Sequence, residues 1–279
     1  MVSSRRLSDQ AGFSLIELAI VLLLIGIVAA GSLAVLSSVT KRKQQSDTRN
    51  ALELVTANLV LYVSRSYRLP CPADGASASG AELRDSVIQA CTALSTGVVP
   101  WLTLGLAESD VLDGWGNRLT FRVAPELVQA NAMNFSACDP AGTSLAVGAE
   151  PYQVCNARCA GALANCTPIG RVVVNKGLTV RNQSGVVLTQ PAAGTGAAFV
   201  LLSHGENGHG AFNTAGVLQT GTGYVGTDEV LNANNQPLRS FYVADTPNLL
   251  EGAGRFDDLV TFKSVHALSA LARLDARSH

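Results

Sequence analysis

The sequence predicts an α+β fold in which one long N-terminal helix packs against an antiparallel sheet. Three observations support this prediction. The chain begins with an apolar run, continues as a proline-free helical pattern up to Leu69, and ends in short apolar segments separated by glycine-rich turns. Only 15% of the 279 residues are charged and the formal net charge is −1. This composition argues against disorder and against nucleic-acid binding through a global basic surface.

The predicted helix covers about residues 13–67 and has two halves. Leu18–Thr40 is an uncharged stretch long enough to span a bilayer as a helix. Over residues 41–67, apolar side chains recur every three or four positions, which is the pattern of an amphipathic helix. Pro70 and Pro72 then end it. We expect the first half to lie in a membrane or a filament core and the second half to pack on a globular domain.

Glu17 is the exception in the apolar N-terminal region. A carboxylate at the centre of a membrane-spanning helix costs about 2.5–3.5 kcal/mol on insertion scales, so a partner for its charge is expected. Cleavage of the chain after Gly12 would give Phe13 a positively charged α-amino group. Glu17 of one copy would then meet the amine of a neighbouring copy. The pattern therefore predicts a polymerisation device as well as an anchor.

The segment Gly12-Phe13-Ser14-Leu15-Ile16-Glu17, preceded by a short basic leader, resembles the signature of type IV prepilins. The resemblance implies that an inner-membrane prepilin peptidase cleaves after Gly12 and methylates the new N-terminus at Phe13. It assigns Glu17 to assembly. The implied partners are this peptidase and methyltransferase, other pilin or pseudopilin subunits, the inner-membrane assembly platform and, before assembly, the lipid bilayer.

The resemblance also predicts the domain organisation and the location. The segments are a leader peptide (1–12), a transmembrane or filament-core helix (13–40), its amphipathic continuation (41–67) and a periplasmic, β-rich globular domain (68–279). The chain would cross the inner membrane once and would join a periplasmic or extracellular filament after assembly.

A basic cluster after the apolar run argues for the opposite orientation. Lysines and arginines at 41, 42, 43 and 49 outnumber those at 5 and 6, and cytoplasmic flanks normally carry the excess. We keep the periplasmic orientation because long domains translocate largely regardless of charge. The cluster either meets acidic groups on a neighbouring subunit or forms a solvated face.

Two other interpretations use the same N-terminal residues. In a secretory signal peptide, Arg5 and Arg6 would be the basic end and Val28-Ala29-Ala30 a cleavage site. The apolar run, however, continues past these alanines, and Glu17 interrupts its start. A plain uncleaved membrane anchor gives Glu17 no partner.

The six cysteines indicate disulfides in an oxidising compartment. All follow the apolar run, and no Cys-x-x-Cys pair suggests a metal ribbon or a redox motif. Six thiols allow about 15 pairings, so the connectivity stays open. Cys71 and Cys91 are one candidate pair, and a second cluster contains Cys138, Cys155, Cys159 and Cys166. Reduced, buried thiols remain an alternative for a minority.

The globular part is predicted to hold short strands and two short helices. Leu119, Phe121 and Val123 alternate with polar residues, which predicts a half-buried strand. Further strands are expected at 171–175, 178–181, 186–189, 197–203, 240–244 and 258–263. Helical patterns are expected at Glu82–Leu94 and Val265–Ala276.

One glycine-rich stretch, Ser203–Gly210, invites a metal-site interpretation. His204 and His209 lack the spacing of a zinc-binding helix, so a two-histidine site has little support. Through the resemblance, Ser203–Gly208 and Asp257-Asp258-Leu259 look like the calcium loop of major pseudopilins. The oxygen ligands would be Glu206, Asn207, Asp257 and Asp258, although Asn207 stands where the family has an acid. A metal-free turn is the alternative.

The sequence thus predicts a non-enzymatic structural subunit of a type IV pilus or a type II secretion pseudopilus, either a minor pilin or a pseudopilin. No cofactor is expected other than this calcium ion. No Gly-x-Ser-x-Gly motif and no phosphate-binding loop occurs, which argues against common hydrolase and nucleotidase classes. The alternative is a membrane-tethered periplasmic binding protein or adhesin that does not polymerise.

Overall fold

The computed structural model describes residues 15–88, 90–92, 97–133, 173–234 and 241–274, with the side chains of 27–37 excluded. The chain divides between Gln45 and Ser46 into two compact units. Helix α1, Leu15–Ser66, contains residues of both, which confirms the predicted long helix within the described range. Among the described residues, no helix has an apolar stretch long enough to cross a membrane.

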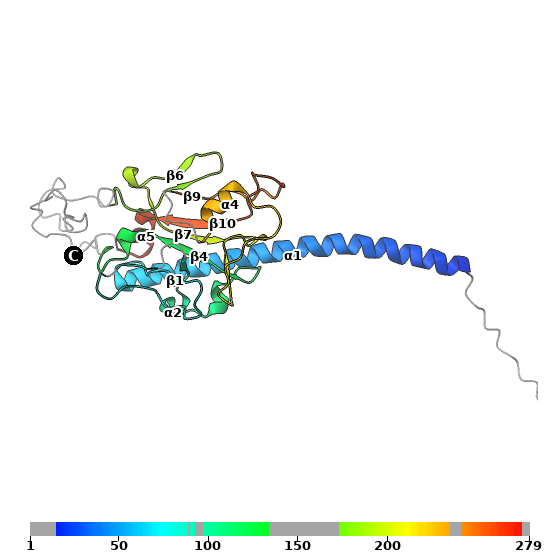
Figure 1. Ribbon diagram of the computed structural model, residues 1–279, viewed down its shortest axis with the longest axis horizontal. Helices are drawn as coiled ribbons and strands as arrows, with labels where there is room; N and C mark the ends of the chain where they lie inside the picture. Colours follow the sequence, from blue (N-terminus) through cyan, green and yellow to red (C-terminus); the bar gives the residue numbers. More distant parts are fainter. Residues whose placement is uncertain (1–14, 89, 93–96, 134–172, 235–240, 275–279) are drawn as a thin grey trace, which may run out of the picture. The chain divides into compact units, whose positions relative to one another are not determined.

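The second unit is built on a five-stranded sheet in the order β1-β2-β4-β7-β10, in which every neighbouring pair is antiparallel (Figure 1). The chain therefore has the predicted α+β fold. The strands are β1 (Ala73–Asp74), β2 (Gly97–Val98), β4 (Thr120–Val123), β7 (Ala197–Ser203) and β10 (Leu259–Ser264).

The described part of this unit also contains two smaller sheets, three short α-helices and three 3-10 helices. In one of these sheets β5 pairs with β9 in parallel, a departure from the antiparallel expectation. One sheet consists of β3 (Asn117–Arg118) and β8 (Phe212–Asn213), and the other of β5 (Val180–Arg181), β6 (Val187–Thr189) and β9 (Tyr242–Val243). The helices are α2 (Trp101–Leu104), α4 (Thr227–Asn232) and α5 (Val265–Leu271).

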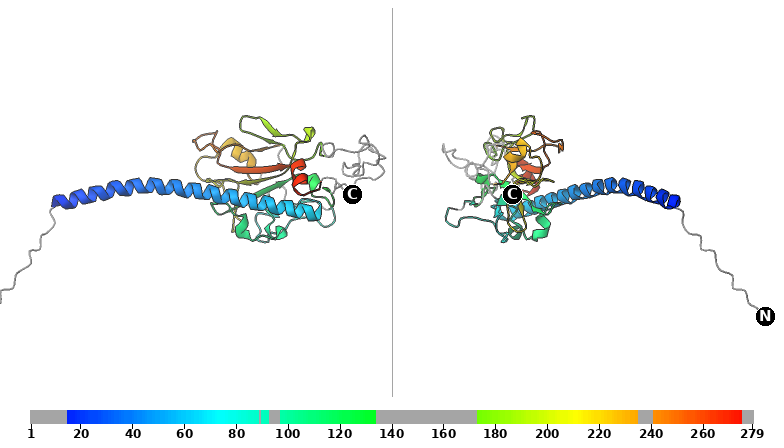
Figure 2. Two further views of the ribbon diagram at one scale, coloured as in Figure 1. Left: turned by 180° about the vertical axis from the view of Figure 1, so that it is seen from behind. Right: turned by 45° about the vertical axis from the view of Figure 1, so that its right-hand side comes forward.

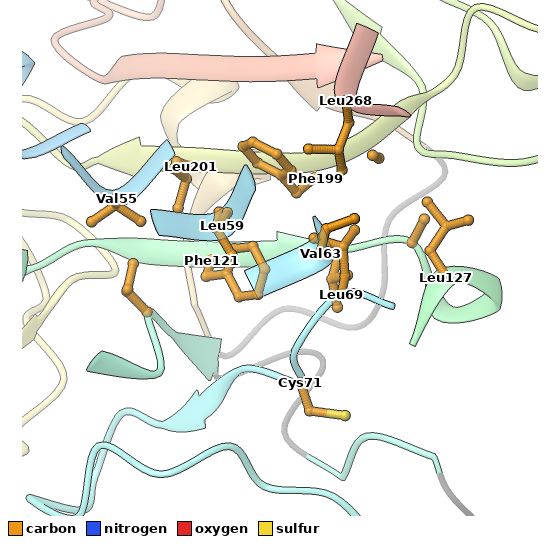
Figure 3. Packing of buried hydrophobic residues seen from close by; sticks show 14 of the residues in the cluster. Val55, Leu59, Val63, Leu69, Cys71, Phe121, Leu127, Phe199, Leu201 and Leu268 are labelled. Carbon is orange, nitrogen blue, oxygen red and sulfur yellow. The ribbon is translucent and has the colours of Figure 1, made fainter. Parts of the chain in front are cut away.

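The main core lies between the C-terminal part of α1 and one face of the sheet. Apolar residues of α1 recur at spacings of three and four and are buried: Leu52, Val55, Leu59 and Val63. They share a cluster with Phe121, Phe199 and Leu201 of the sheet (Figure 3). The amphipathic pattern over 41–67 therefore marks the face by which α1 packs on the sheet.

The other face of the sheet carries a second, smaller core. Side chains alternate between the faces of a strand, so Val200 and Leu202 of β7 point away from Phe199 and Leu201. They cluster with Val180 and Tyr242 of the small three-stranded sheet. The left view of Figure 2 accordingly shows the five-stranded sheet as a middle layer between α1 and this small sheet. Strand β7 is buried along its whole length because it is covered on both sides.

Three local predictions are wrong. Residues 82–92, as far as they are described, form no helix: Arg84 bridges to Cys91, and Asp85 Oδ1 accepts from the amides of Val87 and Ile88 in a tight turn. Residues 173–175 of the strand expected at 171–175 form a turn. Strand β4 is fully buried instead of half-buried, because its polar side chains enter an internal hydrogen-bond network described below.

A disulfide joins Cys71 to Cys91, which is the candidate pair from the sequence. Glu82 ties the loop between these cysteines to the end of α1. Its carboxylate accepts hydrogen bonds from both Arg68 Nη atoms, at 2.8 and 2.6 Å, and from the Cys71 amide at 2.9 Å. These charge-assisted contacts hold the pKa of Glu82 below its usual value even though burial opposes them. The other four cysteines lie outside the described residues.

Candidate functional site

The first feature of functional interest is the start of α1. Glu17 lies in its first turn, where a negative charge is favoured by the helix dipole. Gly12 and Phe13 lie outside the described residues. Large apolar side chains from Leu15 to Ile25 are exposed on all sides of the helix, by between 43% at Val21 and 88% at Leu15. A helix that is apolar all round requires cover by lipid or by other apolar helices.

The second feature is a cluster of three buried carboxylates in the second unit. Glu229, Asp257 and Asp258 each place a carboxylate oxygen within 4.8 Å of the others. Glu229 comes from α4, and the two aspartates directly precede β10. Two oxygens bound to one Ca²⁺, each at about 2.4 Å, lie at most about 4.8 Å apart. The spacing of the carboxylates therefore fits a calcium ion.

Hydrogen bonds fix these carboxylates from three segments. Glu229 Oε1 accepts from the Asp257 amide at 2.8 Å, and Oε2 accepts from the Gly226 amide at 2.6 Å and from Asn207 Nδ2 at 2.9 Å. Asp257 Oδ2 accepts from the Asn207 amide at 2.9 Å. Asp258 Oδ2 accepts from Asn232 Nδ2 at 2.8 Å. The cluster is thus organised before any ligand binds.

Two oxygens of the cluster remain unsatisfied. Asp257 Oδ1 and Asp258 Oδ1 are buried without a hydrogen-bond partner. Burial raises the pKa of Asp257 to about 6, assisted by its contact with Glu229 and opposed by the Asn207 amide and Arg255. Burial also raises the pKa of Asp258 well above its usual value, and the charges of Glu229 and Asp257 add to this effect. Unsatisfied, mutually repelling carboxylates are the environment that a cation would relieve.

His204 borders this cluster from the end of β7. Its side chain is fully buried, its Nε2 lies 2.9 Å from Thr120 Oγ1, and its Nδ1 lies 3.9 Å from Asp258 Oδ1 without a hydrogen-bond partner. Burial, with the charge of Arg122 next, lowers the pKa of His204 to about 3, so the imidazole is neutral at physiological pH. His204 therefore adds no positive charge to balance the carboxylates.

The polar network continues through the sheet from His204. Asn234 Nδ2 donates to Thr120 Oγ1 at 2.7 Å, and Asn234 Oδ1 accepts from Arg122 Nη2 at 2.9 Å. These contacts explain why the polar side chains of β4 are buried. Thr120 and His204 are a hydrogen-bonded hydroxyl and imidazole, but both are fully buried and closed to a substrate.

The predicted calcium ligands are only partly brought together. Asp257 and Asp258 lie in the cluster. The Asn207 side chain donates its Nδ2 to Glu229 Oε2. Glu206 is exposed and lies outside the described cluster. Gly205 has φ +58, and a side chain there would collide with the Asp257 backbone, so this glycine permits the close approach of the two halves. His209 does not join His204 at a metal site, because its Nδ1 donates to the Thr220 carbonyl at 2.8 Å.

Sequence reasoning missed Glu229. Its local signal is that of a helix N-terminus, in which an acid three residues after Gly226 returns to the Gly226 amide. Only the tertiary fold shows that the same carboxylate also contacts Asn207 and Asp257.

Comparison with known proteins identifies the N-terminal feature. Residues 7–33 match the model of the prokaryotic N-terminal methylation motif, which is the signal of type IV pilins and pseudopilins. The chain therefore carries, at its N-terminus, the cleavage and methylation motif of type IV pilin-like proteins. The motif implies processing by prepilin peptidase and a membrane-anchored prepilin, and proteins of this class are typically non-enzymatic. No curated protein and no solved structure matches the chain.

Proposed function

We propose that this chain is a structural subunit of a type IV pilus or a type II secretion pseudopilus, cleaved after Gly12 and N-methylated at Phe13. The observation that carries the proposal is the methylation motif at residues 7–33 followed by a helix whose apolar side chains are exposed on all sides. In a filament, these helices bundle and bury one another. Each fully buried Leu, Ile or Val contributes about 1.5–3 kcal/mol.

Glu17 sets the register of the bundle in this proposal. When its carboxylate meets the amine of Phe13 from a neighbouring copy, both charges are paired inside an apolar environment. Any other stagger leaves an unpaired buried charge, which is strongly unfavourable. The leader (1–12), the membrane or filament-core segment (13–40), its amphipathic continuation (41–67) and the periplasmic domain (68–279) then have distinct roles. Inner-membrane residence precedes assembly on the inner-membrane platform.

The test combines mass spectrometry with a matched pair of variants. The N-terminal peptide of the mature chain should begin at methylated Phe13. Glu17→Ala should abolish incorporation into sheared filaments while membrane insertion persists, and Glu53→Ala, an exposed acid further along α1, should leave incorporation unchanged. A mature chain starting at Gly31, or an intact Met1, would refute the processing. Normal function of the Glu17 variant would favour the non-polymerising tethered binding protein or adhesin.

A second proposal concerns the carboxylate cluster. We propose that Asp257, Asp258 and Glu229 hold a calcium ion, in place of the set Glu206, Asn207, Asp257 and Asp258. The unsatisfied oxygens Asp257 Oδ1 and Asp258 Oδ1 support it, because hard oxygen ligands prefer Ca²⁺. Binding to the folded state alone stabilises by about 2.7 kcal/mol at a hundredfold excess over Kd.

Thermal unfolding of the full chain in detergent, with calcium or with chelator, tests this second proposal. Calcium should raise Tm of the wild-type protein and of Glu251→Gln, whose carboxylate is exposed and outside the described cluster. It should leave Tm of the double variant Asp257→Asn, Asp258→Asn unchanged. Equal Tm values for the wild type with calcium and with chelator would favour the metal-free turn.

A further inference from the structure

An acidic groove lies on the second unit between α1 and the loop before β3. Its volume is about 500 Å³. The α1 side presents Asp47, and the loop side presents Asp110 and Asp113. No lysine or arginine is among the described residues that line it. The groove therefore presents a surface of one sign, where the potential of each carboxylate adds to that of the others.

The walls of the groove are held in place by hydrogen bonds. Thr48 Oγ1 of α1 accepts from the Gly114 amide at 2.9 Å, and this contact docks the loop on the helix. Asp113 is buried at the base, where its Oδ2 accepts from Ser203 Oγ at 2.6 Å. Asp47 is exposed and Asp110 is partly exposed at the rim. Among the ion pairs of the described chain, none includes Asp47 or Asp110.

A basic segment of complementary charge occurs on α1 itself. Lys41, Arg42 and Lys43 are exposed and directly follow the uncharged stretch Leu18–Thr40. In the proposed orientation this segment lies on the periplasmic side of the membrane, where the positive-inside tendency disfavours it. Its charge is opposite to that of the groove, so the acidic groove of a neighbouring copy is a complementary partner for it.

We propose that the acidic groove of one copy binds the basic segment 41–43 of a neighbouring copy. This inference rests on the proposed filament function and specifies its subunit contact. In the proposed Glu17–Phe13 contact, a residue of one copy meets the residue four positions earlier in the sequence of its neighbour, and four positions of helix correspond to about 6 Å. Asp47 and Lys43 are also four positions apart in the sequence, so a contact between Asp47 of one copy and Lys43 of its neighbour would have the same register. One translation thus satisfies the terminal pair and the charges beside the groove.

Charge reversal tests the contact in the full-length chain. A photo-cross-linking amino acid at Ser109, an exposed residue of the groove wall, should capture the 41–43 segment of a second, differently tagged copy. The same probe at Leu102, which is exposed and does not line the groove, is the control. The groove-reversed copy carries Asp47→Lys and Asp110→Lys, and the segment-reversed copy carries Lys41→Glu, Arg42→Glu and Lys43→Glu.

We expect each reversed copy alone to lose at least about fivefold in cross-linked dimer, as the loss of two or three surface ion pairs predicts. When only the groove-reversed copy carries the probe, mixing it with the segment-reversed copy should restore the cross-link, because the acidic segment of one then faces the basic groove of the other. Restoration also shows that the reversed copies fold. In the wild type, about 1 M salt should lower the yield, since the screening length falls to about 3 Å.

Three results would overturn the inference. Unchanged cross-linking and normal filament incorporation of both reversed copies would refute the groove contact but not the filament function. Absence of cross-linking in the wild type, together with absence of the chain from filaments, would refute both the groove contact and the filament function. If only the segment-reversed copy is impaired, and it also loses affinity for vesicles containing anionic lipid, the segment binds a lipid surface instead of the groove.

Discussion

We expect the effect of Asp258 on the stability of the fold to depend on whether a cation is bound in the carboxylate cluster. It is buried, it faces Glu229 and Asp257, and one of its oxygens has no hydrogen-bond partner. Without a cation, ionisation of this carboxyl carries an uncompensated electrostatic cost. In the proposed calcium site, the same oxygen would be a ligand.

Asp258→Asn should therefore change the sign of its effect with calcium. In chelator, we expect the variant to be about 1–3 kcal/mol more stable than the wild type, because a buried charge is removed while an oxygen still accepts from Asn232. In calcium the order should reverse, because one ligand is lost. Urea unfolding in both conditions measures this. A variant that is less stable in both would mean that the ionised carboxylate is stabilised by the protein alone.

The raised pKa of Asp257 makes a second prediction at the residue level. Its pKa is about 6 in the folded chain against 3.8 for the ordinary group, so between these values the folded state holds the extra proton. The stability contributed by Asp257 is present below about pH 4 and is lost as pH rises through about 6. The pKa of His204 is lowered to about 3, so His204 makes stability rise with pH over an overlapping pH range. The contribution of Asp257 must therefore be measured as a difference between the wild type and a variant at Asp257.

The measurement is the difference in unfolding free energy between the wild type and Asp257→Asn, in chelator, at several pH values. This difference should fall by up to about 3 kcal/mol between about pH 4 and 6 and stay flat above that range. Glu251→Gln provides the baseline for an exposed carboxyl. A flat difference across the range would show that Asp257 has an ordinary pKa.

At the level of elements, α1 packs on the sheet through one stripe of apolar side chains. Leu59 is fully buried against the sheet, whereas Leu61, two positions along, is 51% exposed. Leu59→Ala should cost about 2–5 kcal/mol of unfolding free energy, since it leaves a cavity in the core. Leu61→Ala should change it by less than about 0.5 kcal/mol. Equal effects of the two substitutions on urea midpoints would mean that α1 does not pack by this face.

The loop closed by Cys71 and Cys91 is the second element with a measurable contribution. A cross-link over a separation of 20 residues is expected to stabilise by about 3 kcal/mol through the unfolded chain. The double variant Cys71→Ala, Cys91→Ala should lose roughly this amount in urea unfolding. Glu82 and Arg68 should hold the loop in place without the disulfide, so the sheet signal in circular dichroism should persist. A double variant without sheet signal would contradict this.

The elements differ in how far sequence could predict them. The run at 197–203 was predicted as a strand and is β7 with the same bounds, because an apolar segment flanked by turns has few other solutions. The amphipathic stripe gave the helix and its packing face for the same reason. The helical spacing of residues 82–92 led to a wrong prediction. The bridge from Arg84 to Cys91, the disulfide and the Asp85 turn outweigh that spacing, and the first two depend on contacts that the local pattern does not contain.

The candidate site was likewise predictable where its residues are adjacent in sequence and unpredictable where the tertiary fold brings them together. The motif around Glu17 is contiguous in sequence and was therefore readable. The carboxylate cluster combines α4 with the segment directly before β10, so only Asp257 and Asp258, which are adjacent, could be named together. Glu229 and the buried Thr120 and His204 depend on strand pairing and on register, which one sequence does not specify.

At the scale of the whole molecule, the division between Gln45 and Ser46 predicts two separable roles. The described core residues begin at Leu52, so the part of α1 that the globular domain needs lies within the second unit. The fragment Ser46–His279 should therefore fold alone, without detergent, with a cooperative urea transition. Its unfolding free energy should lie within about 0.5 kcal/mol of the full chain in detergent, because few of the lost residues are expected to contribute to the core.

A shorter fragment provides the contrast. A chain starting at Val60 lacks Leu52, Val55 and Leu59, which cover the sheet face that carries Phe121 and Phe199. Each of the lost leucines alone is worth about 2–5 kcal/mol, which together reaches the total stability of an ordinary domain. This fragment should be unfolded or aggregated, with no cooperative transition by circular dichroism. If it unfolds cooperatively like the longer fragment, α1 is not part of the core, and residues 46–66 serve only the filament.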